Sequence, residues 1–128
     1  MGDSRGYLVR AGKIEQITED HSLVSEQVKA GILSTDAVKG HRLKNIITRS
    51  VGYQPEVETD LRMKDLKKGD KILLCSEGLS NLVEDEEMNK MVQKYSVKEA
   101  CEKLVNLANE RGGDDNITIV VLQVIETN

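Results

Sequence analysis

The chain has 128 residues, which is enough for one domain with a single hydrophobic core but too few for two. Its 18 basic and 22 acidic residues give a net charge of -4 with both signs interspersed, which excludes the basic surface expected of a protein that binds nucleic acid or an anionic membrane. Phe and Trp are absent, so we expect an aliphatic core.

The cysteines and the hydropathy pattern indicate a cytoplasmic protein. Cys75 and Cys101 lie far apart in separate apolar segments, which is typical of reduced, buried thiols rather than of a disulfide or a zinc site. No apolar run is long enough for a membrane span and no signal peptide precedes the first motif. We therefore expect a soluble chain.

The first elements in chain order are two strands. Residues 6–10 and 13–18 are short strand-like runs on either side of Ala11 and Gly12. Because glycine readily adopts a positive φ in a tight connection, this segment predicts a β-hairpin.

The pattern then changes to helical spacing. Apolar residues between Leu23 and Ile32 recur at helical intervals, and Ser34 with Asp36 can start a second short helix. Alternation of apolar and charged residues over 57–63 predicts a strand with one solvated face.

Two further strands and two helices are predicted in the second half. Residues 71–75 form a short apolar strand, and residues 117–125 are apolar on both faces, which predicts an inner strand of a sandwich. Between them, Asp85 is predicted to cap one helix, and Ser96 with Glu99 forms a capping box for the next. Gly112 is predicted to end that second helix in the left-handed conformation.

This order of elements predicts an α+β fold in which helices pack on a sheet. The strands are too few to cover both faces of a two-sheet core, so residues 1–128 are expected to form part of one domain, a partial β-sandwich flanked by helices. Such a chain alone is expected to expose apolar surface and an unpaired strand edge, and therefore to be marginally stable or to self-associate.

Acidic residues lie next to two of the predicted strands. Asp115 belongs to a carboxylate-rich turn directly before the last apolar run, and Glu77 follows the strand that ends at Cys75. Carboxylates are preferred by hard cations such as Mg²⁺ and Mn²⁺, so these positions are candidates for a metal site. The alternative for Asp115 is a turn residue or cap, which is also how we interpret Asp114.

Five segments in this order closely resemble the metal-dependent protein Ser/Thr phosphatases of type 2C, especially the bacterial members: GDSRGYL (2–8), TEDHS (18–22), NIITRSVG (45–52), LLCSEGL (73–79) and GDDNIT (113–118). The resemblance covers only the C-terminal half of that catalytic domain. Segments of the N-terminal half, which carry a phosphate-binding Arg and an Asp-Gly pair that binds both catalytic metals, are not matched. The resemblance implies the family's αββα architecture.

The resemblance also implies a set of metal ligands. By motif, Asp115 ligates one catalytic metal, Glu77 takes the place of an Asp that touches this metal and an additional, loosely held one, and Asp3 is the other ligand of the additional ion. Glu in place of Asp moves the carboxylate outward by about one C–C bond, which is expected to weaken metal binding. Asp3 has the alternative role of a turn acid bonded to its neighbours.

Other positions are assigned supporting roles by the resemblance. His21 and Ser22 lie on the active side of the family fold, as possible substrate or flap residues, although a hydrogen-bonded loop histidine is the preferred interpretation of His21. Residues 23–44 correspond to the mobile flap, with an ordinary surface helix pair as the alternative. Gly78, Asn116 and Thr118 are expected to support the metal site, the last two through bonds from their side chains to the backbone.

We therefore interpret the chain as the C-terminal part of a phosphatase that removes phosphate from phosphoserine or phosphothreonine in proteins, using Mn²⁺ or Mg²⁺. Its expected substrates are the phosphoproteins made by a Ser/Thr kinase in bacterial signalling, and the chain alone is expected to be inactive. One alternative is a catalytically impaired relative that serves as a binding or regulatory module, which Glu77 favours. Another is the branch of the family that regulates sporulation or stress sigma-factor partners, against which the 23–44 insert argues.

Overall fold

The computed structural model describes residues 2–34 and 46–127. The chain divides into two compact units. The first contains Met1–Asp3 and Glu19–Arg62, and the second contains Ser4–Thr18 and Met63–Asn128. The predicted insert at 23–44 falls within the first unit.

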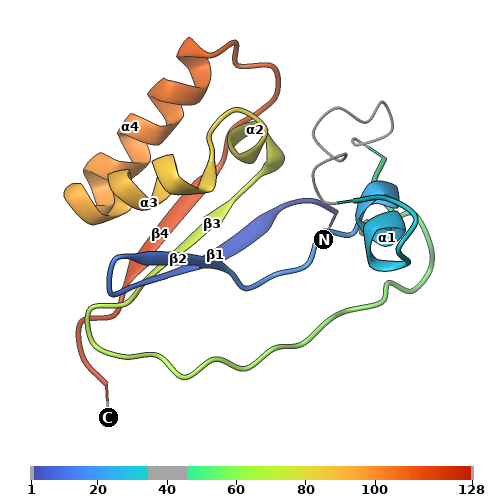
Figure 1. Ribbon diagram of the computed structural model, residues 1–128, viewed down its shortest axis with the longest axis horizontal. Helices are drawn as coiled ribbons and strands as arrows, with labels where there is room; N and C mark the ends of the chain where they lie inside the picture. The colour runs from blue at the N-terminus through green and yellow to red at the C-terminus, as the bar shows by residue number, and fades with distance from the viewer. Residues whose placement is uncertain (1, 35–45, 128) are drawn as a thin grey trace. The chain divides into compact units, whose positions relative to one another are not determined.

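The second unit is built on an antiparallel sheet with strand order β2-β1-β3-β4 (Figure 1). The strands are β1 (Arg5–Arg10), β2 (Lys13–Gln16), β3 (Lys71–Cys75) and β4 (Ile119–Gln123). The hairpin prediction is confirmed: Ala11 and Gly12 join β1 to β2 with φ of 49° and 81°, the positive values that a two-residue hairpin turn needs.

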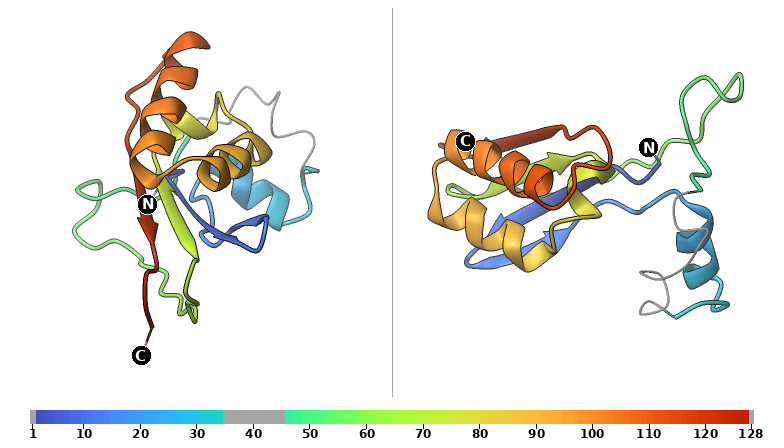
Figure 2. Two further views of the ribbon diagram at one scale, coloured as in Figure 1. Left: turned by 90° about the vertical axis from the view of Figure 1, so that its left-hand side faces the viewer. Right: turned by 90° about the horizontal axis from the view of Figure 1, so that it is seen from above.

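Three helices pack on one face of this sheet, as Figures 1 and 2 show. They are α2 (Glu77–Ser80), α3 (Asp85–Lys94) and α4 (Val97–Glu110). The α+β prediction with helices packed on a sheet is therefore confirmed. The core between the two layers contains the residues Tyr7, Val9, Leu73, Cys75, Leu79, Val83, Met88, Val92, Ala100, Leu104 and Ala108.

The core is not purely aliphatic, because Tyr7 is fully buried in it. Its hydroxyl accepts a hydrogen bond from Arg5 Nη1 at 3.3 Å and donates one to Asp85 Oδ1 at 3.1 Å. Burial raises the pKa of Tyr7, so the ring supplies apolar volume while its neutral hydroxyl keeps polar partners.

The helix ends differ in detail from the prediction. Glu84, not Asp85, is the N-cap of α3, and it forms a reciprocal capping box with Glu87. Ser96 caps α4 as predicted, with its Oγ accepting from the backbone N–H of Glu99 at 3.2 Å. After α4, Gly113 has the left-handed φ of 55°, whereas Gly112 has a φ of 129°. Local patterns mark a helix end, but a shift of one residue changes which side chain makes the cap.

The last strand is an edge strand in the part of the chain that the structure describes, which contradicts the prediction of an inner strand. β4 pairs with β3 alone, and it spans a shorter range than 117–125. Val120 and Leu122 are 44% and 52% exposed, and Leu74 on β3 is 44% exposed. The strand is apolar on both sides, but the helices α2, α3 and α4 of this unit all pack on the other face of the sheet.

The first unit contains one helix among its described residues, α1 (Leu23–Lys29). Ser22 is its N-cap, with Oγ accepting from the backbone N–H of Ser25 at 3.1 Å. Most of the second helix predicted to start at Ser34 and Asp36 lies outside the described residues. Across all the described residues, none of the helices combines the length and apolarity needed to cross a membrane.

The strand predicted over 57–63 is wrong. The segment has no strand geometry, and Leu61 and Met63 at its end are 91% and 100% exposed. Alternation of apolar and polar residues is a local pattern, whereas a strand also needs a hydrogen-bonded neighbour, and 57–63 pairs with no strand in the described chain.

An ion pair between half-buried Arg10 and buried Asp70 fixes the start of β3 in the second unit. Asp70 has a side chain only 3% exposed, and its carboxylate accepts from Arg10 Nε at 2.9 Å and from the backbone N–H of Lys67 at 2.7 Å. The bond from Arg10, followed by that from Lys67, lowers the pKa of Asp70 to about 2. The turn before β3 is therefore held to β1 by charge-assisted bonds.

Leu73 and Leu74 are neighbours on opposite faces of β3 and allow a matched test of the sheet. Leu73→Ala should lower the free energy of unfolding of this chain by about 2–5 kcal/mol, because Leu73 is fully buried. Leu74→Ala should cost less than about 1 kcal/mol, because its face is open. Urea unfolding measures both, and equal losses would show that the second face is covered.

The Asp70 pair predicts a pH dependence. Since the pKa of Asp70 is lower in the folded chain than its ordinary 3.8, its stabilisation is complete above about pH 4 and is lost as the pH falls towards 2. Asp70→Asn should therefore be less stable than the unmodified chain at neutral pH, and the gap should shrink between pH 4 and 2. A gap that stays constant over this range would contradict the assignment.

Candidate functional site

The segments that carry the candidate metal ligands of the second unit lie at one end of its sheet. β3 and β4 are antiparallel, and Cys75 at the end of β3 pairs with Ile119 at the start of β4. Glu77, the first residue of α2, and Asp115, in the turn that precedes β4, therefore lie at the same end of these two strands. The sequence predicted each acid separately, but antiparallel pairing is what places the two segments side by side.

Ser76 joins these two loops. Its Oγ accepts from the backbone N–H of Thr118 at 2.9 Å and donates to the backbone carbonyl of Asn116 at 3.2 Å. Its own N–H donates to the carbonyl of Thr118 at 3.0 Å. Sequence reasoning missed Ser76, and the available signal was a hydroxyl residue at the junction of a strand with a loop.

Gly78 is required by the close approach of the two loops. A Cβ atom at this position would lie 2.2 Å from the carbonyl oxygen of Asn116 and 3.3 Å from that of Asp115. Atoms in folded proteins do not approach this closely, so only glycine allows α2 to pack against the Asp115 turn.

Asp115 lies on the surface of this turn. Its Oδ1 accepts from the backbone N–H of Asn116 at 2.7 Å. The bonds that hold the turn use backbone groups of Asn116 and Thr118 together with side chains of Ser76 and Asp115. The side chains of Asn116 and Thr118 take no part in these three bonds, and their supporting role stays a prediction.

Glu77 is the first residue of α2 and is half-buried, with its Oε2 atom buried. Its carboxylate and that of Asp115 are the oxygen donors that Mn²⁺ and Mg²⁺ prefer, so they fit such an ion in kind. Within residues 2–34 and 46–127, no three His, Cys, Asp or Glu side chains gather into a metal-holding cluster. The two acids would therefore supply part of a coordination sphere.

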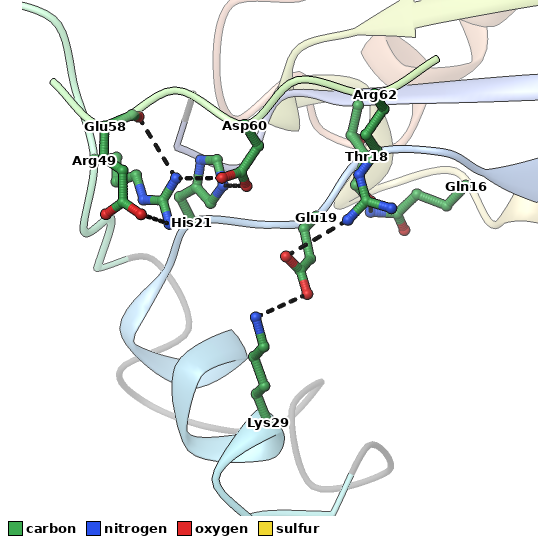
Figure 3. Close-up of polar contacts among 9 residues, drawn as sticks. All are labelled: Gln16, Thr18, Glu19, His21, Lys29, Arg49, Glu58, Asp60 and Arg62. Carbon is green, nitrogen blue, oxygen red and sulfur yellow. Dashed lines mark hydrogen bonds and ion pairs between the residues drawn. The ribbon is translucent and has the colours of Figure 1, made fainter. Parts of the chain in front are cut away.

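The first unit contains a polar cluster centred on Asp60, and Figure 3 shows the contacts of its carboxylate with His21 and Arg49. His21 Nε2 lies 2.8 Å from Asp60 Oδ2, and Arg49 Nη1 donates to Asp60 Oδ1 at 3.0 Å. The bond from His21, followed by that from Arg49, lowers the pKa of Asp60 to about 2. An ionised carboxylate only accepts hydrogen bonds, so His21 carries its proton on Nε2.

Asp3 lies in the same unit and directly follows Gly2, which is held by backbone bonds on both sides. His21 donates its N–H to the Gly2 carbonyl at 2.6 Å, and Gly2 donates its own N–H to the carbonyl of Arg49 at 3.0 Å. Asp3 itself is half-buried. Asp60 and Arg49, which connect to this turn, were not among the predicted site residues.

Ser22, the remaining predicted site residue, has a structural task. Its side chain is buried and its Oγ caps α1. The adjacent His21 is mostly buried, with a side chain 14% exposed.

Known proteins are similar to this chain over nearly its whole length. The chain is similar to the serine/threonine phosphatase stp of Listeria welshimeri, with 40% identity over 124 residues that cover 96% of this chain and 49% of that protein. It is also similar to the crystal structure of the serine/threonine phosphatase PstP/Ppp of Mycobacterium tuberculosis, with a TM-score of 0.91, 38% identity, and coverage of 98% of this chain and 53% of that one.

A second structure of PstP, its catalytic domain in complex with two manganese ions, matches with a TM-score of 0.84 and 37% identity over 98% of this chain and 52% of that chain. The chain thus spans about half the length of the stp and PstP chains it matches here. The family model for protein phosphatase 2C matches residues 1–117. This chain therefore belongs to the protein phosphatase 2C family.

Proposed function

We propose that this chain forms the C-terminal half of a catalytic domain that hydrolyses phosphoserine and phosphothreonine in proteins with the help of Mn²⁺ or Mg²⁺. The observation that carries the proposal is the contact between the start of α2 and the turn before β4. There Ser76 and Gly78 bring Glu77 next to the turn of Asp115. Relatives named serine/threonine phosphatases, similar over almost all of this chain, support the same conclusion.

In this proposal Asp115, Glu77 and Asp3 are metal ligands. When bound, the ions would lower the pKa of a coordinated water and neutralise phosphate charge. Ser76 and Gly78 orient the Asp115 carboxylate by fixing the backbone of its turn, and the Asn116 N–H holds one of its oxygens. Support for manganese comes from the related PstP structure that contains two manganese ions.

The proposal extends to the surroundings of the enzyme. Its substrates are phosphoproteins produced by a Ser/Thr kinase, and it acts in the cytoplasm. Residues 23–44 serve as its flap. This chain alone is inactive and self-associates through the open face that exposes Leu74, Val120 and Leu122, because buried apolar area favours association.

A second candidate function is a catalytically impaired regulatory module with the same fold. Glu77 favours it, because a longer side chain at a metal-binding position alters the reach of the carboxylate. The two candidates differ in whether the acids bind metal and support turnover, which the following variants measure.

Asp115→Ala, in a full-length protein that contains this chain, should lose nearly all hydrolysis of a phosphothreonine peptide with Mn²⁺. The fold should persist, because the side chain is exposed and makes no core contact. Circular dichroism and turnover are measured together, with Asp114→Ala as the adjacent control. Half of the turnover remaining in Asp115→Ala would exclude Asp115 as a ligand.

Glu77→Asp should lower the Mn²⁺ concentration needed for half-maximal rate by several-fold, since the shorter side chain restores the reach found in the family. A Mn²⁺ titration of the rate gives the answer, and Glu77→Gln, which keeps the length but removes the charge, is the control. A higher Mn²⁺ requirement in Glu77→Asp would mean that the site has adapted to Glu.

Gly78→Ala should destabilise the protein by about 1–3 kcal/mol and reduce turnover, because the new methyl group displaces the Asn116 carbonyl and with it the Asp115 turn. Ser80→Ala on the same short helix should have little effect on either. Unfolding and rate measurements on both variants test this, and a neutral Gly78→Ala would show that the loops do not meet as described.

A further inference from the structure

We propose that Asp60 is a positioning residue that holds the Gly2–Asp3 turn in place through His21 and Arg49. The inference rests on the proposed function, in which Asp3 is a metal ligand. All of the residues involved belong to the first unit.

The first step is the way Asp60 divides its two oxygens between partners. Oδ2 bonds to His21 Nε2 at 2.8 Å and Oδ1 accepts from Arg49 Nη1 at 3.0 Å, so one carboxylate joins two residues that are distant in sequence (Figure 3). Both bonds are charge-assisted, which makes them stronger and shorter than bonds between neutral groups.

The second step is that the backbones of these same two residues hold Gly2. The His21 N–H donates to the Gly2 carbonyl, and the Arg49 carbonyl accepts from the Gly2 N–H. The Thr48 N–H donates to the His21 carbonyl at 2.8 Å, which links the segment of Arg49 directly to His21. Asp60 therefore fixes, through side chains, the two residues that fix Gly2 through the backbone.

The third step concerns Gly2 itself. Gly2 is buried with a φ of +60°, and an added Cβ would lie 3.3 Å from Ile47. It has no side chain with which to anchor the turn, so the direction in which the chain enters Asp3 depends on these neighbours. A shift of His21 or Arg49 would move Asp3 with it, and ligand positions tolerate little displacement.

The chain offers a matched control for Asp60. Glu58 also pairs with Arg49, with an Oε1 to Nη2 distance of 3.5 Å, but its side chain is 77% exposed. Among the described residues, no hydrogen bond or ion pair joins Glu58 to His21. Glu58 therefore has the same charge as Asp60 and shares its partner Arg49, but it does not link Arg49 to His21.

The experiment compares Asp60→Asn with Glu58→Gln in the full protein by NMR. Amide exchange at His21 and Thr48 should speed up by about tenfold in Asp60→Asn, since hydrogen bonds to a charged group are lost on both sides. Amides of β1 and β3 should keep their rates, which shows that the fold persists. Glu58→Gln should leave His21 and Thr48 within about twofold of the unmodified protein.

Mn²⁺ titration supplies a second readout, the paramagnetic broadening of the Asp3 amide signal. Asp60→Asn should require several-fold more Mn²⁺ for the same broadening, whereas Glu58→Gln should not. Arg49→Gln removes the bond from the Arg49 guanidinium to Asp60 and should change both readouts in the same direction by a smaller amount. It serves as a second variant if Asp60→Asn does not fold.

The outcomes separate this inference from the function on which it rests. Unchanged exchange at His21 and Thr48 in both Asp60→Asn and Arg49→Gln would overturn the positioning role. If Mn²⁺ does not broaden the Asp3 amide signal in the unmodified protein, the ligand role of Asp3 is wrong. Faster amide exchange at His21 and Thr48 in Asp60→Asn would then still support the role of Asp60 in holding the Gly2–Asp3 turn. Equal effects of Glu58→Gln and Asp60→Asn would also contradict the proposal, because general loss of negative charge would explain them.

Discussion

The candidate site depends on the contact between α2 and the turn that precedes β4. At Gly78 the backbone of Asn116 comes so near that no side chain atom fits between them, and Ser76 bonds to both ends of the segment from Asn116 to Thr118. β3 leads into α2 and the turn leads into β4, so this contact lies directly beyond the last residue pair of the two strands, Cys75 and Ile119. The acids Glu77 and Asp115 are thereby placed by backbone geometry, which is more rigid than positioning by their own flexible side chains.

The two units use different physical means to hold their acids. In the second unit, a buried core beneath the sheet supports β3, and a hydroxyl and a glycine set the loops. In the first unit, regular structure is sparse among the described residues, and charge-assisted bonds around Asp60 do this work. Such bonds are directional but weaken when one partner is neutralised, so the Gly2–Asp3 turn depends on electrostatics more than the Asp115 turn does.

Family membership and the departure at Glu77 lead to different expectations about activity. The similarity to named phosphatases extends over nearly all of the chain and favours a working half of an enzyme. Glu77 places a longer carboxylate at the edge where the loops meet, with its Oε2 atom buried. The longer side chain changes the reach of a carboxylate at a position that binds metal in the family, which favours the catalytically impaired alternative.

The sequence by itself determined the elements whose signals are local. The hairpin at Gly12, the strand 71–75 and the Ser96 cap depend on φ preferences, apolar runs and side-chain bonds within a few residues, and they appear as expected. Motifs also identified the family. Only the tertiary structure decided what depends on distant partners. The segment 57–63 alternates like a strand but has no neighbouring strand to pair with in the described chain. β4 is an edge strand because it pairs with β3 alone, and the sequence of one strand does not show how many neighbours it has. For the same reason Ser76 and Asp60 escaped notice, since a serine or an aspartate becomes important only when folding brings its partners, 40 or 39 residues away in sequence, within hydrogen-bonding distance.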